Sequence, residues 1–168
     1  MNIDLKQMKK VSRGDILLRP NNICACAYKV EIGCLKSYII DKTGKEHILQ
    51  FAPENWLLSD LDAFINKKPS TVFIDVIEDS TISIIPQFDY IRMEKAALIE
   101  LTTKFQNNLV ATNKRVVSLL SATAEERYLE FTKTYPTLIQ RLPLKLIASY
   151  IGITPEYLSD VRRKLAKK

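Results

Sequence analysis

The segment Leu144–Arg163 (LKLIASYIGITPEYLSDVRR) constrains the fold of this chain more than any other part of it. Ala148 is a small residue in the middle of a first predicted helix, where a second helix can cross closely. Gly152, four residues later, suits a turn that needs a left-handed backbone. The pattern predicts a helix-turn-helix. Apolar residues stand at the positions that hold its two helices together: Ile147, Ile151, Ile153, Leu158 and Val161.

Capping residues mark the beginning of the second helix. Thr154 is the expected N-cap, Pro155 the first helical residue, and Glu156 places a carboxylate in the first turn. Between Arg162 and Lys168, five of seven residues are basic. Such a run can be a solvated tail. Because it follows this helix, we interpret it as a set of contacts to phosphate groups.

When a helix-turn-helix binds DNA, the second helix enters the major groove with its N-terminal residues toward the base edges. The outward-facing side chains here offer hydroxyls and a carboxylate to bases, and cations to phosphates. The alternative is a helical hairpin with no nucleic-acid role. The predicted DNA-binding residues are Lys145, Thr154, Pro155, Glu156, Tyr157, Ser159, Asp160, Arg162, Arg163 and Lys164.

Up to about Tyr90 the chain alternates between apolar and polar residues, which is typical of strands. Asp41–Lys45 (DKTGK) contains Gly44 and predicts a hairpin loop, whereas Trp56–Ile65 breaks the alternation and predicts a short helix. These short strands predict an antiparallel barrel or double-sheet roll. The alternation is clearest at Val30, Ile32 and Cys34, at Leu35 and Ile39 with Lys36 and Tyr38 between them, and at Val72, Ile74 and Val76.

Met93–Ala124 contains no proline or glycine and predicts one long helix. Its apolar stripe can pack on its own domain or pair with a copy of itself. Since so long a helix cannot bury its whole stripe within one protomer, we expect a homodimer. Two shorter helices are expected after it: Ala124–Tyr135, and another with Pro143 in its first turn. The residues predicted to face the partner are Leu98, Leu101, Phe105, Leu109, Thr112, Val116 and Leu119.

Composition bounds the class of protein. The 168 residues are 46% hydrophobic and 26% charged, which is typical of a folded globular chain. The net charge of +6 permits a nucleic-acid partner. No stretch approaches the ~20 apolar residues of a membrane helix, and the start MNIDLKQMKK shows no secretory signal. We therefore expect a cytoplasmic protein without membrane contact.

The three cysteines, Cys24, Cys26 and Cys34, match no pattern of zinc or iron–sulfur ligands, and their odd number argues against a disulfide framework. We expect buried strand cysteines, with oxidation sensing as the less favoured alternative. His47 is the only histidine, so no metal site and no cofactor are predicted.

The same count argues against catalysis. Metal enzymes of the cupin class share the double-sheet roll but need two or three histidines around the ion. One histidine also supports no defensible Ser/His/Asp or Cys/His pairing. Asp60 and Asp62 stand two positions apart on a predicted short helix and so do not face each other. The chain is predicted not to be an enzyme.

The segment Ala124–Leu165 resembles the Crp/Fnr family of bacterial transcription regulators, in particular a subgroup with degenerate sensor domains. Val11–Pro20, Tyr28–Phe51 and Asn55–Ser70 resemble it as well. The resemblance implies an α+β fold: an N-terminal antiparallel β jelly roll of cyclic-nucleotide-binding type (1–90), a long dimerisation helix (91–121), and a C-terminal winged helix-turn-helix domain (122–168). It implies as partners double-stranded DNA with a palindromic operator, a second copy of the chain, and RNA polymerase.

The sensor region departs from the family pattern. Nucleotide-binding members cradle a cyclic phosphate with a Gly-Glu pair and an Arg-Ser/Thr-Ala run. This chain has no glycine between Phe51 and Val72 and no arginine between Arg19 and Arg92, so a bidentate clamp on phosphate is missing. We predict no tight cyclic-nucleotide binding, and either an unknown small-molecule effector or none. The residues predicted for an effector pocket are Trp56, Leu57, Ser59, Asp60, Ser70 and Thr71.

The second helix of the motif departs as well, because Asp160 stands where the family often has an arginine. A carboxylate facing DNA is unfavourable unless it reads a cytosine or pairs with Arg163 or Lys164. The sequence therefore predicts a DNA-binding regulator with an unusual operator. The alternative is a dimeric sensor or interaction protein with reduced or lost DNA binding. The sequence ends at Lys168, so no wing strands are expected after that helix.

Overall fold

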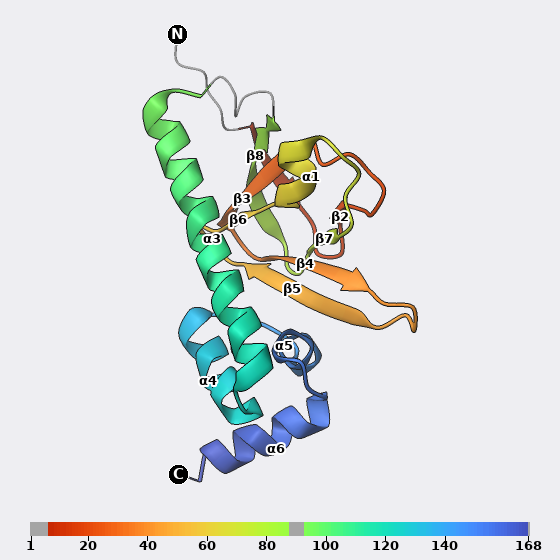
Figure 1. Ribbon diagram of the computed structural model, residues 1–168, viewed down its shortest axis with the longest axis vertical. Coiled ribbons are helices and arrows are strands. Elements are labelled where there is room, and N and C mark those ends of the chain that lie inside the picture. The colour runs from red at the N-terminus through yellow and green to blue at the C-terminus, as the bar shows by residue number, and fades with distance from the viewer. Residues whose placement is uncertain (1–6, 88–92, 168) are drawn as a thin grey trace. The chain divides into compact units, whose positions relative to one another are not determined.

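The computed structural model describes residues 7–87 and 93–167. By their contacts, the residues form two units: 1–39 with 49–109, and 40–48 with 110–168. Antiparallel strands and helices both contribute, so the predicted α+β class is confirmed (Figure 1). The predicted border between residues 90 and 91, and Lys168 of the basic run, lie outside the described residues.

The described strands form two four-stranded antiparallel sheets, with the orders β1-β8-β3-β6 and β2-β7-β4-β5. Buried residues from both sheets meet in one hydrophobic core. Asp41–Lys45 is the predicted hairpin loop, joining β4 to β5, with Gly44 at φ 84°. The strands are β1 (Gln7–Val11), β2 (Ile16–Leu18), β3 (Cys26–Ile32), β4 (Leu35–Ile40), β5 (Glu46–Ala52), β6 (Leu57–Leu58), β7 (Phe73–Val76) and β8 (Ser80–Pro86).

Simple alternation is wrong at two places in the strands. The pairing of β3 with β8 shifts register between Val30 and Ile32, and Ile32 is 63% exposed whereas Val30 is buried. In β4, Lys36 and Tyr38 are buried although the pattern placed them between the apolar positions. Asp75 explains this burial: it accepts a hydrogen bond from the Tyr38 hydroxyl at 2.8 Å and lies 3.9 Å from the Lys36 ammonium.

The expected helix over Trp56–Ile65 is also wrong in its first part. Leu57 and Leu58 are the strand β6, which pairs with β3, and both side chains are buried. The helix α1 (Leu61–Asn66) begins only after Asp60, whose carboxylate accepts the Ala63 amide hydrogen as an N-cap. Leu57 and Leu58 suit a helix or a strand, and their pairing with β3 places them in a strand.

The long helix is present as α3 (Lys95–Ser121), 27 residues. The residues of its predicted apolar stripe differ in their exposure. Leu101 is buried in the core of the first unit, where Phe105 packs against it, so Leu101 cannot face a second copy. Leu109, Val116 and Leu119 are exposed, as are large apolar side chains outside the predicted stripe: Ile99, Val110, Val117 and Leu120.

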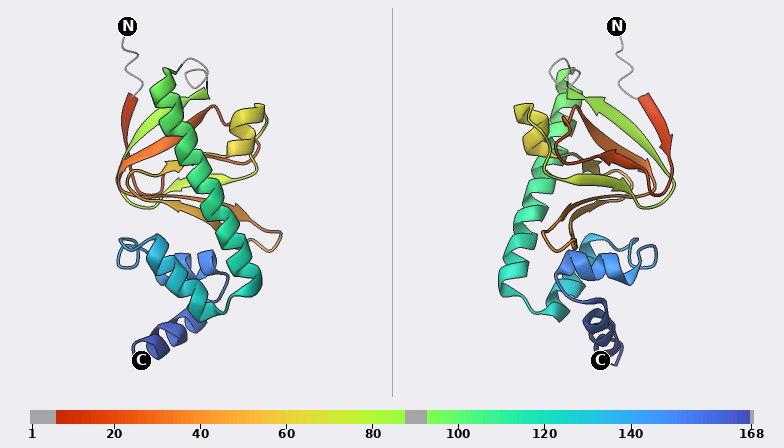
Figure 2. Two further views of the ribbon diagram at one scale, coloured as in Figure 1. Left: turned by 60° about the vertical axis from the view of Figure 1, so that its left-hand side comes forward. Right: turned by 90° about the vertical axis from the view of Figure 1, so that its right-hand side faces the viewer.

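Three further helices follow in the second unit (Figure 2): α4 (Ala124–Thr134), α5 (Leu144–Ile151) and α6 (Pro155–Leu165). Helix α4 begins in a capping box between Thr123 and Glu126 and ends before Pro136, as predicted. Pro143 is the N-cap residue of α5 rather than a residue of its first turn. Its extended backbone (ψ 141°) leaves Leu144 as the first helical residue.

Candidate nucleic-acid interface

The turn between α5 and α6 is built on Gly152, which has φ 73° and ψ 38°. The Ile153 amide donates to the Ala148 carbonyl at 3.0 Å, and the Gly152 amide donates to the Ser149 carbonyl at 3.3 Å. These two bonds form a Schellman motif, which satisfies carbonyls at the end of α5. A Cβ on Gly152 would stand 3.3 Å from Leu119, so space as well as backbone favours glycine.

Four of the five apolar residues predicted to hold the helices together are fully buried, and so is Ala148. Ala148, the small residue predicted for the helix crossing, has no exposed surface. Ile153 is half-buried in the turn. The residues expected to lie between the two helices are therefore buried or half-buried. The four buried residues are Ile147, Ile151, Leu158 and Val161.

Helix α6 begins as the sequence predicts. Thr154 is the N-cap, and its hydroxyl oxygen accepts the Tyr157 amide hydrogen at 3.2 Å. Pro155 is the first helical residue, and Glu156 lies in the first turn. The Ser159 hydroxyl donates to the Pro155 carbonyl at 3.0 Å. Nearly all of the predicted DNA-binding side chains of the second unit are exposed, Pro155 alone being half-buried.

The carboxylate of Asp160 has a cation beside it. Arg163 Nη2 donates to Asp160 Oδ1 at 2.6 Å, one helical turn away. The ammonium of Lys164 lies 3.9 Å from Glu125 on α4. Arg162, Arg163 and Lys164 occupy the last turn of α6, where positive charge also complements the helix dipole. Of the alternatives that the sequence leaves open for Asp160, the ion pair with Arg163 is present.

Sequence reasoning missed Ser149. Its hydroxyl donates to the Glu46 carbonyl at 2.9 Å and accepts the Ile48 amide hydrogen at 3.2 Å. One serine therefore satisfies two backbone groups of β5 from a helix that follows about 100 residues later. No sequence signal could have found this contact, because a serine within α5 is equally compatible with solvent exposure.

Arg115 of α3 was missed for the same reason. Its Nη2 donates to the Ile48 carbonyl at 2.8 Å and to the Tyr150 carbonyl at 2.7 Å, and its guanidinium carbon lies 4.0 Å from the Tyr150 ring centroid. Burial lowers the pKa of the Arg115 side chain. The Tyr150 carbonyl lies in the last turn of α5, where carbonyls lack helical partners, so Arg115 acts as a side-chain cap.

The predicted effector-pocket residues fall into separate groups. Asp60 Oδ2 accepts hydrogen bonds from the Ser70 hydroxyl at 2.9 Å and the Thr71 amide at 3.1 Å. Ser59 instead donates to the Cys26 carbonyl at 3.3 Å, near Cys24. Leu57 and Trp56 belong to the hydrophobic core or pack against it. The structure thus brings Asp60, Ser70 and Thr71 together in one hydrogen-bonded cluster and assigns the other three to different surroundings.

Within the described residues, no group of three or more His, Cys, Asp or Glu side chains is arranged to hold a metal ion. Among the helices of that same part of the chain, none has the length and apolar character that crossing a membrane requires.

The chain matches no family model. A curated relative, the anaerobic regulatory protein of Pasteurella multocida (strain Pm70), is 25% identical over 97% of this chain. The chain spans 64% of that relative's length.

Solved structures resemble the chain over nearly its whole length. The c-di-GMP-responsive global regulator CLP of Xanthomonas campestris has a TM-score of 0.76 at 13% identity, covering 97% of this chain and 87% of that one. FixK2 of Bradyrhizobium japonicum has a TM-score of 0.78 at 15% sequence identity, and the match covers 96% of this chain and 85% of FixK2. A CRP/FNR-family transcriptional regulator of Thermus thermophilus has a TM-score of 0.72 at 16% sequence identity, and the match covers 96% of this chain and 86% of that one. The chain therefore has the fold of the Crp/Fnr transcription regulators, as its sequence resemblance predicts.

Proposed function

We propose that this chain is a dimeric, sequence-specific DNA-binding transcription regulator, and that α5 and α6 are its helix-turn-helix. One observation carries the proposal: Leu158 and Val161 of α6 are buried, while its exposed face begins with a capped, polar N-terminus and ends in three cations. That is the distribution a reading helix needs, with bases at its start and phosphates near its end.

Asp160 is compatible with this function. Its ion pair with Arg163 offsets the negative charge on the exposed face of α6. Glu156 in the first turn keeps a carboxylate for a base edge, where cytosine offers an amino hydrogen. Arg162 is exposed at the helix end, where it can contact a phosphate.

Helix α3 supports the homodimer. Within the second unit, Val110, Val117 and Leu120 are exposed on α3, and Leu120 is 83% exposed. These residues recur at intervals of seven and three, as in a coiled-coil seam. A groove of about 540 Å³ lies beside them, between Lys114 of α3 and Glu130 of α4. A second copy related by two-fold symmetry would cover this surface and present two reading helices to a palindromic operator.

A mobility-shift titration after sequence selection on genomic fragments tests the function. We expect a specific complex with two half-sites about 34 Å apart. Replacing Glu156 with alanine is expected to relax preference at one base pair, by about 1–3 kcal/mol of discrimination, because the carboxylate acceptor is lost. Glu100→Ala, an exposed position on α3, serves as the control. Absence of any shifted band at low salt would overturn the proposal.

The sensor is proposed not to respond to cyclic nucleotides. Asp60 already accepts the hydrogen bonds of Ser70 and Thr71, so these donors are engaged by a carboxylate of the chain itself. A phosphate would have to displace that carboxylate and would meet its negative charge. Isothermal calorimetry with cyclic AMP, cyclic GMP and c-di-GMP is expected to show no binding up to millimolar concentration. Low-micromolar affinity for any of them would contradict this expectation.

The competing proposal is a dimeric sensor or interaction protein with reduced DNA binding, and the exposed Asp160 is the observation in its favour. The two proposals differ in salt dependence. Phosphate contacts predict a steep fall of log affinity with log salt. A partner such as RNA polymerase would instead be recognised without DNA.

A further inference from the structure

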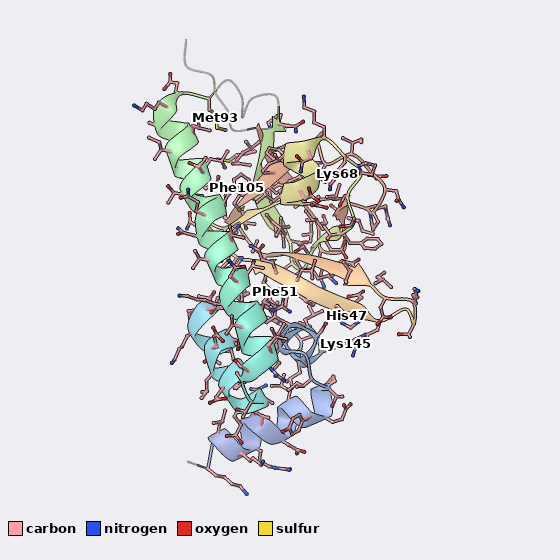
Figure 3. All side chains as sticks on the ribbon, viewed as in Figure 1. His47, Phe51, Lys68, Met93, Phe105 and Lys145 are labelled. Carbon is pink, nitrogen blue, oxygen red and sulfur yellow. The ribbon has the colours of Figure 1, made fainter. Side chains whose placement is uncertain are left out.

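The hairpin between β4 and β5 belongs to the same unit as α5 and α6. A groove of about 340 Å³ opens between its tip and the start of α6. Figure 3 labels His47 on this hairpin and Lys145 on α5. The groove is lined by Gly44, Lys45 and Glu46 of the hairpin, by Lys145 and Ser149 of α5, and by Thr154, among others.

The hairpin is held in place by side chains of α5 and α3 that bond to the backbone of β5. Ser149 bonds to the carbonyl of Glu46 and the amide of Ile48, and Arg115 donates to the carbonyl of Ile48. Because these bonds engage backbone groups next to Lys45, they fix the start of its side chain relative to α5. These hydrogen bonds therefore hold the backbone of Lys45 close to the helix pair that ends in α6.

The hairpin carries charged side chains of both signs, and they differ in how far they are engaged by the turn. Asp41 Oδ1 accepts hydrogen bonds from the amides of Thr43 at 2.8 Å and Lys45 at 3.1 Å, and Asp41 Oδ2 lies 2.7 Å from His47 Nε2. The Thr43 and His47 side chains lower the pKa of Asp41. This carboxylate is engaged within the turn, whereas Lys42 and Lys45 are exposed.

We propose that the hairpin tip is a second DNA contact, in which Lys45 and Lys145 each contact a backbone phosphate beside the bases read by α6. Two lysines against one carboxylate residue, Glu46, give the groove a positive balance, which complements DNA. The groove is continuous with the reading helix, because Thr154 and Pro155 both line it and begin α6. This inference rests on the proposed function.

The salt dependence of DNA affinity tests the hairpin contact. The full chain and the variants Lys45→Ala and Lys145→Ala are titrated with a selected operator at about 50–200 mM salt. Loss of one phosphate contact is expected to reduce the slope of log affinity against log salt by about 0.9. Across that salt range, the fold-decrease in affinity of each variant is then about threefold smaller than that of the unsubstituted chain. Base preference is expected to remain unchanged, because phosphate contacts carry no sequence information.

Two further variants make the result specific. Lys45→Arg keeps the charge and is expected to keep the original slope. Lys10→Ala removes one exposed lysine from β1 in the other unit, giving the same change in net charge, and is also expected to leave the slope unchanged. If the full chain binds DNA and Lys45→Ala has the slope of Lys10→Ala, the hairpin contact is overturned and the proposed function stands. If the full chain binds no DNA, both are overturned.

Discussion

Replacing Leu158 with alanine is expected to lower the free energy of unfolding of the second unit by about 2–5 kcal/mol. Leu158 is completely buried where α6 lies on α5. Truncation removes its apolar contacts and leaves a cavity that the short helices cannot fully close. Since whole domains are stable by only about 5–15 kcal/mol, such a loss removes a large share of the stability of this unit. DNA binding is expected to weaken with it.

Hydrogen exchange measured residue by residue across Leu144–Leu165 checks this expectation. Tyr157→Ala, the adjacent position with 49% of its surface exposed, is the matched control and should change stability by less than about 0.5 kcal/mol. Trp56, the only tryptophan, lies in the first unit, so its fluorescence reports whether that unit is unaffected. Equal protection of α6 in the Leu158→Ala variant and the unsubstituted chain would contradict the packing described.

Replacing Arg115 with leucine is expected to cost about 2–4 kcal/mol of stability, because two backbone carbonyls lose a charged donor. These carbonyls belong to Ile48 in β5 and Tyr150 in α5, and the cation–π contact with the Tyr150 ring is lost as well. Arg115→Lys retains the charge but not the planar fork, so we expect about half of the loss.

Chemical denaturation gives the change in free energy, and exchange of the Ile48 amide shows whether the hairpin loosens. Lys133→Leu is the control, since it makes the same substitution of a cation at an exposed position of the second unit. A loss in Arg115→Leu no larger than that in Lys133→Leu would show that the carbonyls find water instead.

Features set by local chemistry could be predicted from the sequence. The N-cap of Thr154, the helical start at Pro155 and the left-handed turn at Gly152 depend on the residues themselves and their immediate neighbours. The packing of Ala148 was predictable as well, because helix pairs of this kind need a small residue at their closest approach.

Features set by distant partners could not be predicted. Lys36 is buried only because Asp75 and Tyr38 lie on the same sheet. Leu101 turns toward the core of the first unit although α3 alone cannot distinguish that face from a dimer seam. Ser149 and Arg115 act on backbone groups 101 and 67 positions away, respectively. Composition and periodicity carry no information about such pairs.

The discontinuous second unit has a consequence for how such chains can evolve. The border between the two units crosses the sequence at three points, after Ile39, Ile48 and Leu109. A single genetic crossover near residue 110 would join the hairpin to helices from another chain, and the backbone of Glu46 and Ile48 would depend on side chains of those helices for its bonds. Exchange of the helices between relatives would therefore keep the hairpin in place only where the incoming segment carries a hydroxyl and a cation at the positions of Ser149 and Arg115.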